Sequence, residues 1–183
     1  SLAYAVTCVV IPVFNAAAAL SACLQALRRS IPESTAVLLI DDASTDPAVA
    51  DLLAEQVAMR PSSKLLRNAA NLGFVGSVNR AFAASADDVL LLNSDTLPTA
   101  GFLAAMEVCA AGDAGIASVT PFSNNAEICS FPRFCAPNPV PVDADCVAAA
   151  FRLETSSPVV VPTAVGFCMW MRRAAIDAVG DFD

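Results

Sequence analysis

Two short acidic segments each follow an apolar run, and their residue types could hold a metal ion and a phosphorylated ligand. Residues 90–98 read Leu-Leu-Leu-Asn-Ser-Asp-Thr-Leu-Pro, so an expected buried strand delivers Asp95 onto the loop at its end. A second apolar run, at residues 36–40, ends in Asp41-Asp42-Ala43-Ser44-Thr45-Asp46. Open α/β sheets bind ligands outside the carboxyl ends of their strands. The sequence therefore predicts a site for a divalent metal and a phosphorylated ligand on these two loops.

The composition narrows the chemistry available to such a site. The 183 residues include no histidine, which excludes histidine-based acid–base catalysis and imidazole ligands for a metal. Oxygen ligands favour a hard cation, so we expect Mg²⁺ or Mn²⁺. The net charge of −8 argues against nucleic acid as a partner. A phosphorylated ligand must then find positive potential in backbone N–H groups or in the metal ion.

The overall composition indicates a globular protein with a large core. Hydrophobic residues make up 56% of the chain and charged residues 15%. The longest apolar stretches fall short of the roughly 20 residues that cross a bilayer, and no charged-then-apolar leader precedes the first predicted strand. Several of the seven cysteines lie in apolar periodic segments, and none form a C-x-x-C pair. We therefore expect neither a membrane span nor a signal peptide, and a cytoplasmic protein in a reducing compartment.

Strand and helix patterns alternate through the first 120 residues. The predicted strands cover residues 6–14, 36–40, 64–67, 89–92 and 116–119. The predicted helices cover residues 16–29, 47–59, 75–84 and 100–110. Asn15 is expected to cap the first helix and Asp46 the second, with Pro47 at its first position. This order predicts an α/β fold with a mostly parallel sheet and right-handed crossovers.

The alternation dissolves between residues 121 and 162, a segment rich in proline. Residues 143–153 could supply one short helix within it, and so long an irregular stretch is unusual unless it is functional. A strand at residues 164–171 and a helix at residues 172–179 follow. The Arg172-Arg173 pair is interpreted as the polar start of that helix rather than as a phosphate clamp.

Five short motifs follow one another over nearly the whole chain: Val10-Ile11-Pro12-Val13-Phe14-Asn15, Asp41-Asp42-Ala43-Ser44-Thr45-Asp46, Asn71-Leu72-Gly73-Phe74-Val75-Gly76 with Asn79, Asn93-Ser94-Asp95-Thr96, and Gly166-Phe167-Cys168-Met169-Trp170-Met171-Arg172-Arg173. In order and spacing they resemble the nucleotide-diphospho-sugar glycosyltransferases of family 2, which have the GT-A fold. The resemblance looks closest to bacterial members that build cell-surface polysaccharide, including rhamnosyltransferase-like proteins.

The resemblance implies a role for each motif. In the family, the second acid of the D-D-x-S-x-D loop, here Asp42, accepts a hydrogen bond from N3–H of the donor's pyrimidine. This bond separates uracil from cytosine but not from thymine, so a UDP- or dTDP-sugar is the expected donor. Asp95 matches the last acid of the D-x-D motif that ligates the metal, while Asn93 replaces the first acid and brings no charge. The residues expected beside the nucleotide are Pro12, Phe14, Asn15, Asp42, Asn71, Gly73, Asn79, Asn93 and Ser94.

The resemblance also suggests how one domain, residues 1–183, is organised. The donor-binding part is expected at residues 1–120, an acceptor-side irregular segment at residues 121–162, and a closing strand and helix at residues 163–183. In the family an acidic general base deprotonates the acceptor hydroxyl in an inverting transfer. That base lies beyond the segment matched by Gly180-Asp181-Phe182-Asp183, so we expect an incomplete chain with no catalytic base and little transfer activity. A glycan or lipid-linked acceptor is implied, and a lipid-linked one would place the protein peripherally at the inner face of the plasma membrane.

Other interpretations stay open at this point. Asp41 and Asp42 could simply form a turn, residues 71–76 a plain joint between loop and helix, and Phe14 part of the core. A non-catalytic nucleotide-sugar binding module would carry the same donor motifs. A nucleotidyltransferase is less well supported, because residues 15–20 lack its glycine-rich basic loop. The glycine motifs of Rossmann dehydrogenases and P-loop enzymes are absent from the sequence.

Overall fold

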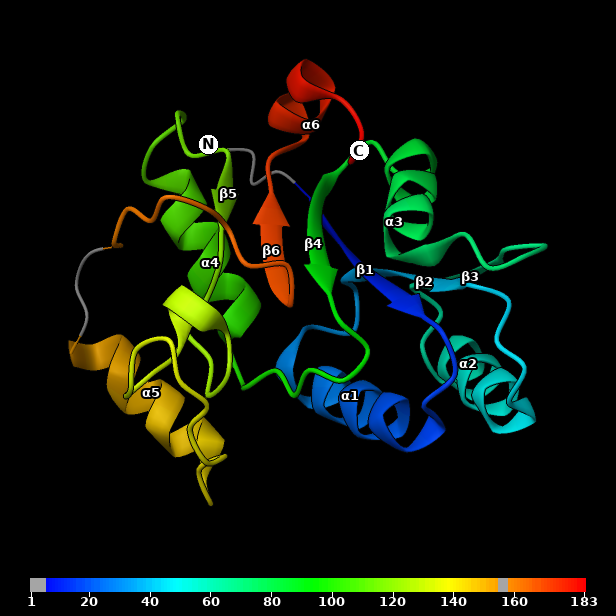
Figure 1. Ribbon diagram of the computed structural model, residues 1–183, viewed down its shortest axis with the longest axis horizontal. Helices are drawn as coiled ribbons and strands as arrows, with labels where there is room; N and C mark the ends of the chain where they lie inside the picture. The colour runs from blue at the N-terminus through cyan, green and yellow to red at the C-terminus, as the bar shows by residue number, and fades with distance from the viewer. Residues whose placement is uncertain (1–5, 155–157) are drawn as a thin grey trace.

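A computed structural model describes residues 6–154 and 158–183, which build one six-stranded sheet between two layers of helices (Figure 1). The strands are β1 (Thr7–Val13), β2 (Ala36–Asp41), β3 (Ser63–Arg67), β4 (Asp88–Leu92), β5 (Ser118–Val119) and β6 (Cys168–Met171). The prediction about an N-terminal leader, and three positions of the irregular segment, fall on residues 1–5 and 155–157, which lie outside this description.

The sheet has the order β3-β2-β1-β4-β6-β5. The first four strands in this order are parallel, and the register pairs Val13 with Asp41 at the carboxyl ends of β1 and β2. β6 is antiparallel to both β4 and β5 and lies between them, although it comes later in the chain. The predicted mostly parallel α/β fold is confirmed, and it brings the ends of β1, β2 and β4 to one edge.

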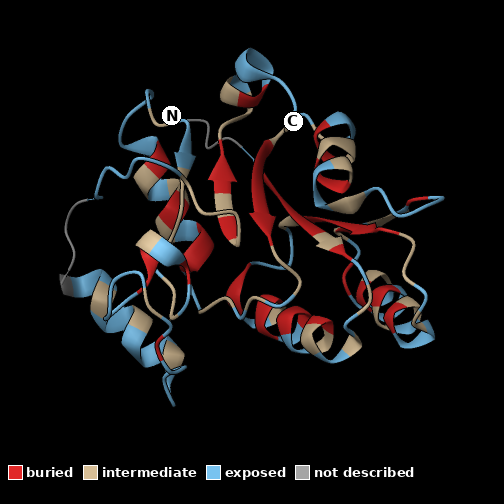
Figure 2. Cartoon of the chain, viewed as in Figure 1, coloured by how far each residue is buried: buried red, intermediate tan, exposed pale blue. Residues whose placement is uncertain are grey.

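Alternate residues of the central strands enter two separate cores. Within β1, Val9 and Ile11 pack on the side of α1 (Ala17–Ser30), α2 (Pro47–Met59) and α4 (Phe102–Ala111). Cys8 and Val10 pack on the opposite side, against α3 (Gly73–Ala84) and α6 (Arg173–Val179). Figure 2 shows the central strands almost wholly buried between these layers. Burial on both faces explains why these strands are apolar at nearly every interior position, and each large buried side chain contributes about 1.5–3 kcal/mol.

The starts of the first two helices differ from each other in their caps. The Asp46 carboxylate accepts a hydrogen bond from the Ala48 N–H at 3.0 Å, so the predicted cap of α2 is confirmed. The predicted cap of α1 by Asn15 is wrong. Asn15 and Ala16 both adopt left-handed conformations, with φ of 55° and 56°, and Ala16 precedes the helix without a side-chain cap. In this tight turn the Asn15 side chain accepts hydrogen bonds from the loop that follows β2 instead of capping α1.

The irregular segment contains a 3₁₀ turn at Glu127–Cys129 and the helix α5 (Ala144–Glu154), which confirms the predicted short helix. Three phenylalanines of the segment form an aromatic cluster with ring centroids 5.0–6.1 Å apart: Phe122, Phe131 and Phe151. β6 is shorter than the predicted strand at residues 164–171. Residues 164–167 lie outside the ladder, and there the Phe167 carbonyl accepts from the Asn93 N–H.

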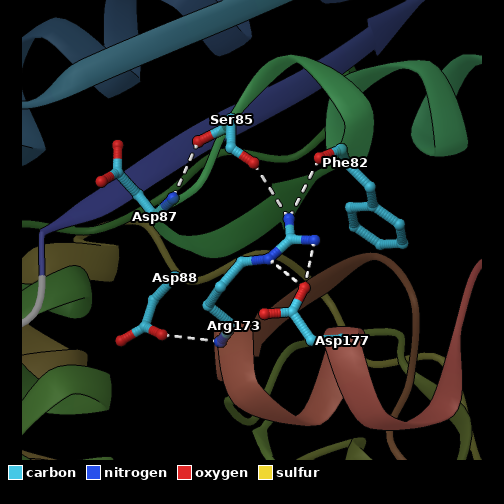
Figure 3. A network of polar contacts seen from close by, with 6 residues as sticks. All are labelled: Phe82, Ser85, Asp87, Asp88, Arg173 and Asp177. Carbon is cyan, nitrogen blue, oxygen red and sulfur yellow. Dashed lines mark hydrogen bonds and ion pairs between the residues drawn. The ribbon is translucent and has the colours of Figure 1, made fainter.

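Both arginines at the start of α6 are structural, as predicted. The Arg173 guanidinium donates to the carbonyls of Phe82 (3.0 Å) and Ser85 (2.9 Å) at the end of α3 and pairs with Asp177 (Figure 3). A cation there complements the negative end of the α3 dipole. Arg172 donates to the carbonyls of Ala110, in the last turn of α4, and of Ile116, before β5, and lies over the Trp170 ring at 5.3 Å.

The cysteines are all free, and four of them are buried in the core: Cys8, Cys23, Cys129 and Cys168. Burial raises the pKa of Cys23 to about 12, which keeps it a neutral thiol. Cys135 and Cys146 are exposed. Among the described residues, none of the helices combines the length and apolar character that a bilayer span needs.

Candidate functional site

A cleft of about 440 Å³ opens where β1, β2 and β4 end and α3 begins. Most of the predicted site residues line it: Pro12, Phe14, Asp42, Asn71, Gly73, Asn93, Ser94 and Asp95. The other lining residues were not predicted: Val13, Ala16, Phe74 and Ser77. The motifs meet here because parallel strands present their carboxyl ends at the same edge of the sheet.

Asp42 is a buried carboxylate held by several donors. Its Oδ1 accepts from Asn68 Nδ2 and from the Leu72 N–H, both at 2.7 Å, and its Oδ2 accepts from the Gly73 N–H at 2.9 Å. Burial alone would raise the pKa of Asp42, but the hydrogen bonds that the carboxylate accepts outweigh burial and lower this pKa. Asp42 is therefore an ionised acceptor that lines the cleft; the Ser77 hydroxyl also donates to this carboxylate, and among the described residues Gly73 is the one backbone donor to its Oδ2.

The neighbouring acid, Asp41, has a different task. Its Oδ1 accepts from the Ser44 N–H at 3.0 Å and its Oδ2 lies 3.5 Å from Arg67 Nε, so the side chain shapes the loop. Ala43 adopts a left-handed conformation with φ of 59°. Asp41 is buried but does not line the cleft, whereas Asp42 does. Of the two adjacent acids, Asp41 therefore stabilises the loop and Asp42 lines the cleft.

Gly73 is the first residue of α3, and its N–H donates to the Asp42 carboxylate. Its N–H is shared between Asp42 Oδ2 and Asn71 Oδ1, at 2.9 and 3.0 Å. Gly73 has a φ of +72°, which side chains other than that of glycine rarely adopt. Ser77 lies one turn further along α3 and is completely buried. Its position four residues after Gly73 was the signal in the sequence that could have placed it on the same face of the helix.

The opposite side of the cleft holds the loop that follows β4. The Asn93 N–H donates to the Phe167 carbonyl at 2.9 Å, and a turn closes with Thr96 N–H donating to the Asn93 carbonyl at 3.1 Å. This turn presents Asp95, whose exposed carboxylate makes no hydrogen bond or ion pair within the described residues. Asn93 and Ser94 add neutral oxygen atoms beside it.

This donor set fits a hard cation that takes most of its ligands from elsewhere. One carboxylate with amide and hydroxyl oxygens suits Mg²⁺ or Mn²⁺, which commonly keep waters and bind substrate phosphates. The described residues contain no group of three or more His, Cys, Asp or Glu that could enclose a metal. Asp95 would therefore supply a single protein ligand to such a cation, with Asn93 and Ser94 beside it.

Two exposed aromatic rings complete the lining. Phe14, which follows β1, is 50% exposed, and Phe74, in the first turn of α3, is 44% exposed. Half-exposed rings offer flat apolar faces for a base or a sugar. Phe14 therefore belongs to the cleft rather than the core, and Phe74 adds an unpredicted aromatic residue. The lining contains two carboxylates and no lysine or arginine.

Asn15 and Asn79 do not line the cleft. Asn15 Oδ1 accepts from the backbone N–H groups of Thr45 and Asp46, at 2.9 and 3.1 Å, and so ties the β1 loop to the β2 loop. Asn79 Nδ2 donates to the Phe182 carbonyl and its Oδ1 accepts from the Phe182 N–H, at 2.8 and 2.9 Å. Both amides bind backbone groups far away in sequence, a pairing that local sequence pattern does not reveal.

Comparison with known proteins identifies the family and agrees with the fold. The family model described as glycosyl transferase family 2 matches residues 8–180. The chain therefore belongs to glycosyl transferase family 2, and its fold is the GT-A fold. Among curated proteins, no sequence matches the chain significantly.

Several solved structures share the fold at low sequence identity. The mannosyltransferase PcManGT from Pyrobaculum calidifontis, in complex with GDP-Man and Mn²⁺, is 20% identical with a TM-score of 0.72, over 100% of this chain and 48% of that one. S. aureus TarS 1-349 in complex with UDP-GlcNAc is 17% identical with a TM-score of 0.69, over 97% and 48%. GalNAc-T7 with UDP, GalNAc and Mn²⁺ is 14% identical with a TM-score of 0.75, over 100% and 38%. The chain spans about half of the first two structures and less of the third.

Proposed function

We propose that this chain forms the donor-binding part of a metal-dependent, inverting glycosyltransferase that uses a UDP- or dTDP-sugar. The observation that supports this most is one cleft that contains both an ionised, buried acceptor, Asp42, and an unpaired carboxylate, Asp95. The first suits the base of a nucleotide, and the second suits a metal bound to its diphosphate.

The geometry of Asp42 favours a base with a single N–H donor. Its Oδ1 accepts two hydrogen bonds at 2.7 Å, whereas Oδ2 accepts one from the Gly73 N–H at 2.9 Å, and the Ser77 hydroxyl adds a further hydrogen bond to the carboxylate. Uracil and thymine offer one N3–H to such an oxygen. Guanine offers an adjacent pair, N1–H and the amino group, which requires both oxygens of a carboxylate. A uracil or thymine donor is therefore preferred over the GDP-sugar that is bound to PcManGT.

The metal end of the cleft would hold the diphosphate. Asp95 would ligate Mn²⁺ or Mg²⁺, and Asn93 and Ser94 would orient the ribose or water beside it. When bound, the cation would neutralise the negative charge that develops on the leaving nucleoside diphosphate. Because the lining has no cationic side chain, we expect nucleotide affinity to depend strongly on the metal. The same lack of cations argues against the triphosphate site of a nucleotidyltransferase.

We infer the class of acceptor from the family. Residues 121–162 would border a glycan or lipid-linked acceptor in the synthesis of cell-surface polysaccharide, by a protein in the cytoplasm or peripherally on the inner membrane face. Asp181 and Asp183 are exposed and make no side-chain hydrogen bond within the described residues, which makes them poor candidates for the base. We therefore expect little sugar transfer by residues 1–183.

Calorimetric titration of UDP tests the proposal. We expect binding with Mn²⁺, strong weakening with EDTA, and a similar weakening with Mn²⁺ in the Asp95→Ala variant. The control is Asp51→Ala, which removes an exposed carboxylate on α2 away from the cleft lining and should bind like the wild type. Metal-independent binding, or equal effects of the two variants, would reject the metal site. Failure to bind both UDP and dTDP would reject the donor assignment.

A further inference from the structure

Asp42 accepts a hydrogen bond from a buried polar residue, Asn68, that does not itself line the cleft. Asn68 follows β3 directly, is 6% exposed and does not line the cleft. Its Nδ2 donates to Asp42 Oδ1 at 2.7 Å and to Ser77 Oγ at 3.0 Å. The Asn68 N–H donates to the Asp41 carbonyl at 2.8 Å, which anchors the residue to the end of β2. The Asn68 side chain is therefore held against the Asp42 carboxylate.

Arg80 determines which way round the Asn68 amide lies. Arg80 Nη1 donates to Asn68 Oδ1 and, at 2.5 Å, to the Arg67 carbonyl. A guanidinium group can only donate hydrogen bonds, so the amide oxygen must face Arg80 and the amide nitrogen must face Asp42. A reversed amide would place its NH₂ group against the guanidinium and its oxygen against the carboxylate, with repulsion at both ends.

Asn68 also determines which oxygen of Asp42 is left for a ligand. Together with the Leu72 N–H it occupies Oδ1 with two donors at 2.7 Å, so a ligand in the cleft is expected to meet Oδ2, to which Gly73 is the one backbone donor in the described part of the chain. Without Asn68, the carboxylate would lose one of the two partners that fix Oδ1, and it could rotate. A carboxylate that can rotate binds the N3–H less strongly, because it must be ordered again when the base binds, and the preference for a base with an N3–H therefore falls.

We propose that Asn68, oriented by Arg80, is a positioning residue for base recognition, which keeps Oδ2 of Asp42 aimed at the N3–H of the donor base. This inference rests on the proposed function of the cleft. Neither residue touches the ligand; Asn68 acts through Asp42, and Arg80 acts through Asn68. This series of hydrogen bonds connects Asn68, at the end of β3, and Arg80, in the second turn of α3, to the base specificity of the cleft.

The test compares UDP with CDP, since cytosine has no N3–H to donate. Affinities for both nucleotides are measured by calorimetry with Mn²⁺ in the wild type and in Asn68→Leu, which has similar volume but no donor. We expect the wild type to prefer UDP, and the Asn68→Leu preference to fall about tenfold, mainly through weaker UDP binding. If Asn68 had only a structural role, its replacement would lower the affinities for UDP and CDP equally and leave the ratio of the two affinities unchanged.

Thermal unfolding will show whether Asn68→Leu is folded. If it is not, two substitutions of Arg80 test the same proposal. Arg80 is only partly buried, so Arg80→Met should fold, and we expect its preference for UDP to fall about threefold. Arg80→Lys retains a group that can only donate and should restore the preference.

The possible failures are distinguishable. A wild type that does not bind UDP, or binds CDP equally well, overturns the proposed base recognition itself. A wild type that prefers UDP, together with folded Asn68→Leu and Arg80→Met variants of unchanged preference, overturns only the role of Asn68 and Arg80. An Arg80→Lys variant that behaves like Arg80→Met overturns the orienting role of Arg80.

Discussion

Replacing Asp42 by asparagine should reverse the base preference of the cleft. The Oδ1 position accepts from Asn68 Nδ2 and the Leu72 N–H, so it must remain an oxygen in the variant. The new amide nitrogen then takes the place of Oδ2, which faces the Gly73 N–H and the cleft. A donor there repels the N3–H of uracil and complements the N3 lone pair of cytosine.

The magnitude follows from the bonds that change. UDP loses one hydrogen bond to a charged group, about 1.5–3 kcal/mol, or roughly 10- to 100-fold in affinity. CDP gains one neutral bond, about 0.5–1.5 kcal/mol, so the UDP-to-CDP preference should shift by about 30-fold or more. In the protein, the Gly73 N–H loses its charged partner, which costs about 2–3 kcal/mol of the typical 5–15 kcal/mol of folding free energy. The variant should therefore still fold.

The assay is calorimetric titration of UDP and CDP, with Mn²⁺, into the wild type and the Asp42→Asn variant, with denaturant unfolding to establish that both are folded. Asp41→Asn is the matched control, because it neutralises the adjacent acid, whose oxygens bind Ser44 and Arg67 instead of lining the cleft. Its preference should equal that of the wild type. A folded Asp42→Asn variant that still prefers UDP, or an equal shift in Asp41→Asn, would refute the reasoning.

Three further predictions concern stability and exposure. Gly73→Ala should lower the free energy of unfolding by about 1–2 kcal/mol, because Gly73 has a φ of +72°. Gly166→Ala is the control: Gly166 has open space around it and no positive φ, so the free energy of unfolding should change by less than about 0.5 kcal/mol. Equal effects of the two substitutions in denaturant titrations would contradict this prediction. Because hydrogen bonds lower the pKa of Asp42 in the folded state, the ionised group stabilises the protein above about pH 4, and this stabilisation is lost as the pH falls further. The difference in unfolding free energy between the wild type and Asp42→Asn should therefore be level from about pH 7 to pH 5 and shrink below about pH 4; a difference that grows on acidification would show that the pKa is raised instead. A thiol reagent should modify the exposed Cys135 and Cys146 first in the native protein and the buried cysteines only after unfolding, as mass spectrometry of the labelled peptides can show; rapid native labelling of the buried thiols would contradict the packing.

Much of the fold could be predicted from local patterns. Strands that are apolar at both parities, such as β1 and β4, indicate a sheet covered on both faces, and the structure divides their side chains between two helix layers. The predicted helices appear with shifts of a few residues at their ends. The position of β6 between β4 and β5 could not be predicted from local patterns, because strand neighbours in a sheet depend on contacts between distant segments.

The sequence by itself determined which loops form the candidate site. Residues that follow strands of a parallel sheet gather at one edge, so Asp42 and Asp95 were expected at the same edge once the strands were recognised. Only the tertiary structure decided what each side chain does there. Asp42 rather than Asp41 lines the cleft, and Asn79 binds the backbone of Phe182 instead. The reason is physical: a strand's end can be predicted from hydrophobic periodicity, but the direction of a polar side chain depends on hydrogen-bond partners that only folding brings within reach.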